Sequence, residues 1–516
     1  MGDVKKHCRE GGFANFITAL TTMDAARKVL LLELNEINWG VVDRLIAQRG
    51  ADFLPNLRKL RAEGAWGVQS AIERSPLLDP WITWVTLHTG VPPAVHGASV
   101  LEQSSTTLRA KRTWQYADEA GLRVGVFGSI SAYPPPPVRG FAIPGPFAPG
   151  NETHPPRLAP VQWINRSQTH AHGGAAAAQG PLASLANGWR LLQLGLAPAT
   201  VGRIALQLLR ERRRPHARWQ RVCLQPRLNF DIFAKQYRAV RPHFATLHSN
   251  HAAHFMHHYW RAWDDSAFPV KASADEKARY GEAVPEGYRL CDELIGRAMA
   301  LLDDDTVLVL ASSMGQQPFI SDRYAAGKIV VRIKQIDALL QLVGRHGITE
   351  VVPTMVPQWN LTVPQAARRA EVVRFFEQVM RVQGGRREHG FAVQETHAQL
   401  TITPLGLARN DEPVTYEFTL PDQRQHSVPL AALFAMDTPT VKQGMHHIDG
   451  LLAFYGRGVR RGVRLPDCTN LDVAPTLLTL MGVPVPAAMH GAVLEVLPGM
   501  GRPALPVPAE APRAAA

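Results

Sequence analysis

Residues 29–36 have the sequence VLLLELNE, and this stretch decides the fold. A short apolar run with a single interruption at Glu33 is typical of a strand that is buried between helices on both faces of a sheet. Asn35 and Glu36 follow directly after the run. In open α/β sheets, ligands bind beyond the carboxyl ends of the strands. The stretch therefore predicts the first strand of a parallel sheet, with Asn35 and Glu36 in the lining of a cleft.

Strand and helix patterns alternate on both sides of this stretch. A helix is predicted from Pro55 to the stop signal at Gly64, because Pro is favoured in the first helical turn and Gly after the last. Further strands are predicted at residues 124–127, 243–248, 306–310 and 451–455. This alternation is the pattern of βαβ units. It predicts an α/β fold with a central, mostly parallel sheet.

Changes in composition divide the chain. Residues 172–180 are rich in Gly and Ala, and the stretch after Gly499 is rich in Pro and Ala. Met23 is an alternative start to Met1. We predict the following parts: a loose N-terminal extension at 1–26, core segments at 27–150, 241–325 and 441–497, a mostly helical insertion (cap) at 151–240, an α+β insertion at 326–440, and a disordered tail at 498–516.

Composition limits the classes of function. The 516 residues are 46% hydrophobic, and 56 Lys+Arg against 44 Asp+Glu give a net charge of +12. This charge favours anionic ligands. Much of it comes from Arg210 and residues 212–214, which we interpret as a solvated basic face rather than a nucleic-acid site. The alternative for segment 201–214 is peripheral contact with a membrane or with an anionic substrate.

The lack of recognisable targeting signals and of paired cysteines points to a reducing compartment. The four cysteines form no C-x-x-C pair, and neither a signal peptide nor an apolar run of about 18 residues is recognisable. We therefore expect a cytoplasmic protein without a transmembrane segment.

Several motifs together carry a resemblance to a known family. They are VLLLELNE at 29–36, LPNLRKL at 54–60, WVTLHTGVPPAVHG at 84–97, NHAAH at 250–254, GMHHIDG at 444–450 and DVAPT at 472–476. In order and spacing they resemble the type I phosphodiesterase and nucleotide pyrophosphatase branch of the alkaline phosphatase superfamily. The resemblance implies a three-layer α/β sandwich with two insertions, two divalent ions, and a Ser or Thr nucleophile.

The residues at the implied metal positions depart from the family's pattern. Asn35 and Asn250 stand where the family has Asp, and residues 312–315, SSMG, stand where it has S-D-H-G. The nucleophile position falls at Asp79. Neutral side chains cannot offset the charge of two divalent ions. We therefore expect no complete two-metal site.

The remaining polar residues give a candidate site. We predict Asp79, Glu36 and His254 as catalytic, because two carboxylates facing imidazoles can act as acid, base or nucleophile without metal. The predicted substrate-binding residues are Asn35, Asn250, Ser313 and Thr83. The structural alternative is that Glu36 caps the following helix and that Asp79 fixes the turn at Pro80.

A histidine-rich run gives a candidate site for one metal ion. His254 and His258 are four residues apart and share a face if the run is helical, and His446 is the third candidate ligand. Such a site would hold a single zinc or manganese ion. The alternative is that these histidines only pack and hydrogen-bond beside Tyr259, so that no cofactor is bound.

Two classes of function fit these observations. The first is a hydrolase or group-transferase that acts on a phosphate-, sulfate- or sugar-containing metabolite, a small-molecule or glycan-type anionic substrate. The second is a catalytically inactive relative that binds an anionic ligand or a partner in the same cleft. Nucleic-acid binding through the arginine run is a weaker third hypothesis, because the run is short and isolated.

Overall fold

The computed structural model describes residues 26–500, apart from 102, 174–180, 326, 345–346, 355–356, 397–398 and 409–411. The predictions for the N-terminal extension up to residue 25, for a start at Met23, for the low-complexity stretch 174–180 and for the tail beyond residue 500 lie outside the described residues.

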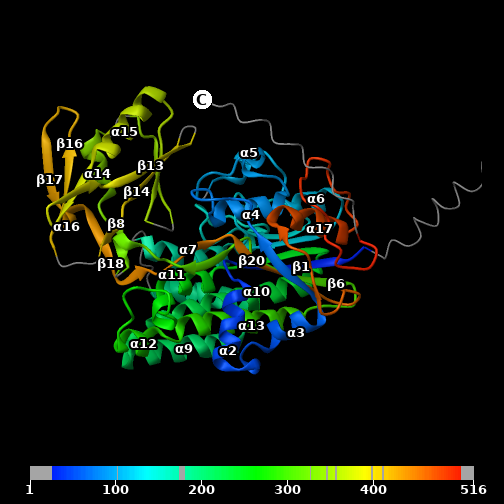
Figure 1. Ribbon diagram of the computed structural model, residues 1–516. Coiled ribbons are helices and arrows are strands. Elements are labelled where there is room, and N and C mark those ends of the chain that lie inside the picture. Colours follow the sequence, from blue (N-terminus) through cyan, green and yellow to red (C-terminus); the bar gives the residue numbers. More distant parts are fainter. Residues whose placement is uncertain are drawn as a thin grey trace, which may run out of the picture.

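A mostly parallel sheet forms the centre of the described chain (Figure 1). Its nine strands follow the order β21-β2-β20-β6-β1-β5-β3-β4, with β22 beside β2. β1 runs parallel to β5 and β6, whereas β20 runs antiparallel to both of its neighbours. The strands are β1 Lys28–Leu34, β2 Ala65–Ser70, β3 Val124–Phe127, β4 Gly140–Ile143, β5 Phe244–Ser249, β6 Thr306–Ala311, β20 Asp449–Tyr455, β21 Val463–Arg464 and β22 Cys468–Thr469. The prediction of an α/β fold with a central, mostly parallel sheet is confirmed.

The alternation along β1 explains why helices cover both faces of the sheet. Leu30, Leu32 and Leu34 point into one hydrophobic cluster, and Val29 and Leu31 point into another. Each fully buried leucine contributes roughly 2 kcal/mol. The first cluster is covered by α2 Trp39–Arg49, α3 Pro55–Glu63, α10 Leu224–Val240, α11 His251–Trp263 and α13 Ala283–Met299, and the second by α4 Pro80–Thr89, α6 Thr113–Glu119 and α17 Val473–Leu480 (Figure 1).

Residues 151–240 are mostly helical in the described part. They contain α7 Ala159–Gly173, α8 Pro181–Leu194, α9 Pro198–Arg213 and the 3₁₀ segments η3 Pro156–Leu158 and η4 Pro215–Cys223, which lead into α10. The short helices α5 Pro93–His96 and α12 Ala274–Tyr280 lie in the core segments. The division of the chain into core segments and insertions stays a prediction.

Residues 328–442 form small antiparallel sheets with a hydrophobic cluster of their own around Phe376 and Tyr416. In Figure 1 they stand beside the central sheet, at the upper left. The elements are β8 Lys328–Ile333, α14 Ile336–Val343, β9 Glu350–Pro353, β10 Trp359–Thr362, α15 Ala366–Gln378, β11 Met380–Gln383, β12 Arg386–His389, β13 Phe391–Thr396, β14 Gln399–Pro404, β15 Leu407–Ala408, β16 Val414–Thr419, β17 Gln425–Pro429, α16 Leu430–Leu433 and β18 Phe434–Lys442.

A two-stranded ribbon connects this part to the core. It pairs β7 Gly315–Pro318 with β19 Gly444–His447 and places Gln316 opposite His446. The helices of the described chain are all too short or too polar to cross a bilayer.

Candidate active site

Polar side chains gather where β1 and its neighbours end. Parallel pairing places Leu34 beside Ser249, so Asn35 and Asn250 emerge next to each other. The Asn35 amide nitrogen donates to the Asn250 side-chain oxygen at 2.7 Å, and the Trp84 indole donates to the Asn35 oxygen at 2.7 Å. The structure thus brings these two predicted substrate-binding residues together, but it engages the Asn35 amide fully with protein groups.

Glu36 turns out of the strand with an unusual backbone. Its φ is 62°, in the left-handed region that costs a residue with a β-carbon about 1–2 kcal/mol. The side chain is 2% exposed. The helix that follows is capped by Asn38, whose side chain accepts from the Val41 amide, so the alternative of Glu36 as the helix cap is wrong. This turn places the Glu36 carboxylate among side chains of α11 and of the β7–β19 ribbon.

Two histidines face the Glu36 carboxylate. The Nε2 atom of His257, on α11, lies 3.1 Å from one carboxylate oxygen, and the Nε2 atom of His446, on β19, lies 3.7 Å from the other. The Nδ1 atoms point the opposite way: His257 donates to the Gly444 carbonyl at 3.0 Å and His446 to the Leu78 carbonyl at 2.8 Å. Backbone carbonyls therefore fix both rings with Nε2 directed at Glu36.

These contacts set the charge of the Glu36 carboxylate. Burial alone would raise its pKa, but the charges of His257 and His446 and hydrogen bonds from His257 and Gln316 outweigh it and lower the pKa to about 2. Burial lowers the pKa of His446, although Glu36 opposes that shift. At neutral pH the site therefore holds an ionised Glu36.

Gln316 supports Glu36 from the ribbon. Its amide nitrogen donates to Glu36 and to the Ala253 carbonyl. The cross-strand register places it opposite His446. Gly444 passes so close to α11 that a β-carbon there would lie 2.6 Å from the Met256 backbone carbonyl oxygen. The ribbon thus needs glycine at this position.

Asp79 caps a helix and is also affected by the charge of Glu36. It is the N-cap of α4, where its side chain accepts from the Trp81 amide at 3.1 Å. Burial raises the pKa of Asp79, and the Glu36 charge adds to that effect, while His446 and Lys442 oppose it. Asp79 is therefore both a turn residue and an electrostatic neighbour of the Glu36–His446 pair.

Lys442 is a cation of the site that the sequence reasoning missed. Burial lowers its pKa, and the charges of Glu36 and Asp79 oppose that shift. A half-buried ammonium close to two carboxylates can attract the anionic part of a substrate.

The hydroxyl groups of Thr83 and Ser313 lie 2.8 Å apart, and both residues are fully buried. The two hydroxyls form a hydrogen bond with each other. Thr83 lies on α4, one turn after Asp79. The prediction that they bind substrate directly stays a prediction, and the geometry gives them a role in fixing α4 against the end of β6.

His254 and His258 lie elsewhere on α11. Their rings contact each other, with centroids 4.5 Å apart. Among the described residues, the group whose ligand atoms lie within 4.8 Å of one another consists of Glu36, His257 and His446. The structure thus places His257, rather than His254 or His258, beside Glu36 and His446. Spacing along α11 does not single out His257, because His254, four residues after Asn250, lies on the same face of the helix.

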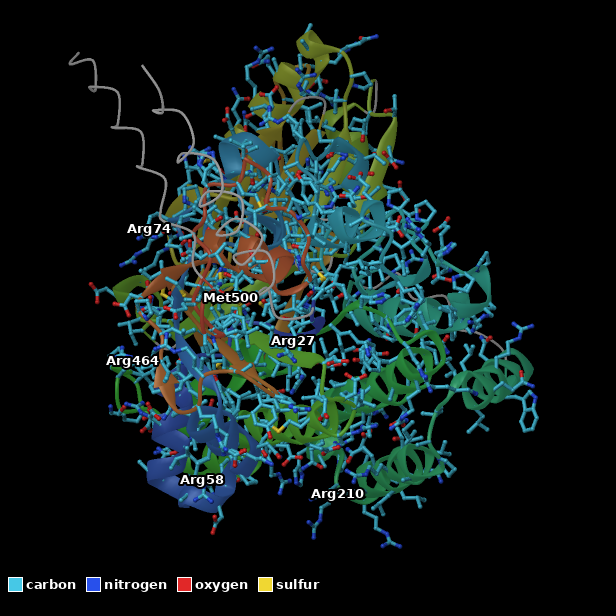
Figure 2. All side chains as sticks on the ribbon, turned by 90° about the vertical axis from the view of Figure 1, so that its right-hand side faces the viewer. Arg27, Arg58, Arg74, Arg210, Arg464 and Met500 are labelled. Carbon is cyan, nitrogen blue, oxygen red and sulfur yellow. The ribbon has the colours of Figure 1, made fainter. Side chains whose placement is uncertain are left out.

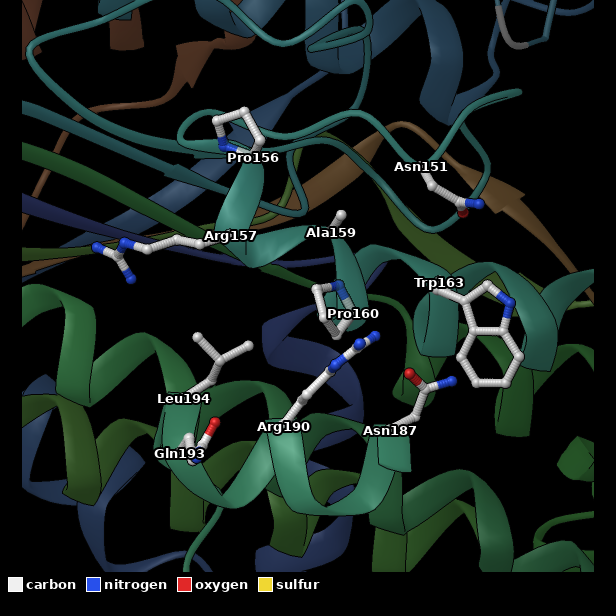
Figure 3. A pocket seen from close by; sticks show the side chains of 10 residues that line it. All are labelled: Asn151, Pro156, Arg157, Ala159, Pro160, Trp163, Asn187, Arg190, Gln193 and Leu194. Atoms are coloured by element: carbon white, nitrogen blue, oxygen red, sulfur yellow. The ribbon is translucent and has the colours of Figure 1, made fainter. Parts of the chain in front are cut away.

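A second buried carboxylate near the site, that of Glu33, has partners of its own. Glu33 is fully buried and contacts His88 and His248, each at 3.1 Å, and its pKa falls to about 2 because these contacts outweigh the opposing effect of burial. A separate hollow of about 790 Å³, lined by Arg157, Trp163 and Arg190, opens between α7 and α8 (Figure 3). The residues that line it include no acid and no imidazole.

Comparison with known proteins agrees with this architecture. The family model described as type I phosphodiesterase / nucleotide pyrophosphatase matches residues 29–398. The chain belongs to this family. The recognition of the alkaline phosphatase superfamily from the motifs is confirmed, since the phosphodiesterase family is part of it. No match was found among curated proteins.

Membership in the phosphodiesterase family supports the prediction that the protein is a hydrolase. The match includes Glu36, Asp79, Asn250 and His257, and it ends before His446.

Proposed function

We propose that the protein hydrolyses an ester of an anionic metabolite, one that contains phosphate, sulfate or a sugar, at the site formed by Glu36, His257, His446 and Asp79. One observation carries the proposal. The Nε2 atoms of His257 and His446 converge on an ionised Glu36 while their Nδ1 atoms are held by backbone carbonyls. A decayed site would not need to keep this orientation.

The residues fit one metal ion and not the pair that the family resemblance implies. For a second ion, Asn35, Asn250 and Ser313 offer neutral groups, and Asn35 and Ser313 are engaged with Trp84, Asn250 and Thr83. For one ion, Glu36, His257 and His446 form a two-histidine, one-carboxylate set that leaves a coordination position open. The Nδ1–carbonyl hydrogen bonds are those that orient histidine ligands.

Glu36, His257 and His446 would therefore hold a single zinc or manganese ion. When bound, such an ion polarises the ester oxygen as a Lewis acid.

The protein's own groups supply the rest of the chemistry. Asp79 stands where the family resemblance places the nucleophile, and its raised pKa makes it a better proton acceptor than an ordinary aspartate. We propose that Asp79 takes a proton from the attacking water while the water oxygen bonds to phosphorus or sulfur, and that the bond from that atom to the leaving oxygen breaks. The leaving oxygen then takes a proton from solvent, and Asp79 returns its proton to solvent. Lys442 neutralises the anionic part of the substrate.

A second candidate function has one observation in its favour. The buried hydroxyls of Thr83 and Ser313, near Asp79, bond to each other, so neither of these two is free to attack as in the family pattern. The protein would then be an inactive relative that binds an anionic ligand or a partner in this cleft.

Turnover of chromogenic esters separates the two functions. We would assay bis(p-nitrophenyl) phosphate, p-nitrophenyl phosphate and p-nitrophenyl sulfate with added zinc or manganese. The proposal predicts turnover of at least one ester, reduced at least ~100-fold in His257→Ala, where a metal ligand is lost.

The matched control is His258→Ala, which removes the neighbouring imidazole on α11 and should leave turnover unchanged. Equal turnover in wild type and His257→Ala would contradict the proposal. Binding of inorganic phosphate or sulfate without turnover of any ester would favour the inactive relative.

A further inference from the structure

Helix α9 has the reverse of the usual arrangement of a surface helix. Its inward face carries Thr200, Gln207 and Glu211, all at most 9% exposed. Its outward face carries Leu206 and Leu209, which are 67% and 58% exposed. Soluble helices normally bury leucine and expose glutamine and glutamate. The inverted burial therefore leaves an apolar stripe of α9 without a partner in the described chain.

Contacts with the following segment hold this orientation in place. The Gln207 amide donates to Glu211 and to the Ala217 carbonyl, each at 2.9 Å. The Arg221 guanidinium donates to both Glu211 oxygens, at 2.8 and 2.7 Å. At the start of α9, the Thr200 hydroxyl donates to Asp231. Turning the leucines inward would break this buried polar network, so their exposure is built into the fold.

Arginines surround the apolar stripe. Arg210 and Arg213 follow Leu206 at four and seven residues and so share its side of the helix. Arg210 lies at the lower margin of the molecule in Figure 2. Arg210, Arg212, Arg213 and Arg214 form no ion pair with any residue in the described part of the chain. Positive side chains near the C-terminus of a helix interact favourably with the helix dipole. This effect explains neither the exposure of the leucines nor the number of arginines.

The preceding helix also exposes apolar side chains. Three residues separate α8 from α9, and α8 exposes Trp189 by 64% and Leu192 by 40%. Tryptophan with leucine and arginine is the composition of helices that lie in the membrane interface, where the aromatic ring sits at the level of the headgroups.

We infer that α9, with its exposed leucines and its arginines from Arg210 to Arg214, is a docking surface for a membrane that contains anionic phospholipid. The leucines enter the boundary between headgroups and acyl chains, and the guanidinium groups pair with lipid phosphates. Charge complementarity favours this occupant over a second copy of the chain, which would bring two unpaired arginine clusters together. The inference is independent of the proposed hydrolysis.

Vesicle co-sedimentation tests this docking surface. The full-length protein would be mixed with vesicles of phosphatidylcholine containing about 30% phosphatidylserine, and with pure phosphatidylcholine vesicles. We expect binding to the anionic vesicles that falls with rising salt, because screening weakens exposed charge pairs. Leu206→Ser with Leu209→Ser should weaken binding at least ~10-fold, and Arg210→Gln with Arg213→Gln should do the same.

Matched controls keep the experiment decisive. Ile320→Ser removes an apolar side chain that is 46% exposed elsewhere, and Arg424→Gln removes an exposed arginine elsewhere; both should leave binding unchanged. Circular dichroism would verify that all variants are folded.

Three results would overturn the inference: no binding of wild type to anionic vesicles at low salt, equal binding by the α9 variants, or a dimer in solution that the Leu206→Ser, Leu209→Ser variant abolishes, which would assign the stripe to a second copy.

Discussion

At Asn35, the side-chain amide forms hydrogen bonds through both its nitrogen and its oxygen. Its nitrogen donates to Glu36 at 2.9 Å and to Asn250 at 2.7 Å. An aspartate there would place a negative oxygen against two acceptor oxygens in a buried position. Such an uncompensated buried charge costs several kcal/mol. The neutral amide is therefore required by its neighbours when no second ion is present.

Asn35→Asp should accordingly lower the free energy of unfolding by about 3 kcal/mol, because it buries an unpaired charge. Urea unfolding with and without excess zinc measures this. We expect that added zinc does not restore the free energy of unfolding of Asn35→Asp. Zinc-dependent recovery to wild-type stability would mean that a second ion binds at Asn35, contrary to the one-ion site.

Helices and strands whose formation depends on local residue patterns could be predicted from the sequence. The helix from Pro55 to Gly64 appears as α3 with Gly64 as its C-cap, and the run at 29–34 lies within β1. The helical pattern of residues 365–382 predicts one helix, but the helix α15 covers only Ala366–Gln378, and the strand β11 begins at Met380. Pattern alone could not find this boundary, because β11 is fixed by pairing with distant β16.

The site needed contacts between distant elements. Asn35, Glu36 and Asn250 follow strands, so their convergence could be predicted from parallel pairing. His257 could not be chosen over His254 by spacing within α11 alone. The choice depends on β19, whose Gly444 carbonyl holds His257 and whose His446 faces the same carboxylate.

Helix α4 offers a way to separate the two roles of Asp79. Asparagine caps a helix as well as aspartate does, whereas alanine does not cap. We expect Asp79→Asn to change stability by less than about 0.5 kcal/mol and Asp79→Ala to cost about 1 kcal/mol. Both variants should lose ester turnover, because both remove the proton acceptor.

Thermal melts and ester assays on the two variants, run side by side, check this expectation. Wild-type turnover in Asp79→Asn would reduce Asp79 to a turn residue.

Across the whole molecule, buried neutral histidines make stability depend on pH. Burial lowers the pKa of both His96 and His251 to about 4. The His96 Nδ1 accepts from the Ala98 amide at 3.0 Å, and the His251 Nε2 donates to the Gly287 carbonyl at 3.0 Å. In the unfolded chain these histidines take up protons near pH 6.5. Their contribution is therefore full above pH 6.5 and is lost as the pH falls towards 4.

At pH 5 the loss should be about 2 kcal/mol for each of the two histidines, relative to pH 7.5. Urea unfolding at pH 7.5, 6 and 5 measures it. His96→Gln with His251→Gln should flatten this dependence, while His216→Gln, in an exposed position, should not. Identical pH profiles for wild type and the double variant would refute this origin of acid sensitivity.

The central claim is that Glu36, His257 and His446, and not His254, form the reactive centre. Elemental analysis of metal in wild type, His257→Ala and His254→Ala, each chelated, reloaded with zinc and desalted in parallel, tests it most directly. The account predicts about one equivalent of zinc in wild type and in His254→Ala, and loss of at least ~90% of it in His257→Ala. Zinc that persists in His257→Ala but disappears in His254→Ala, or wild type that binds no ion, would contradict it.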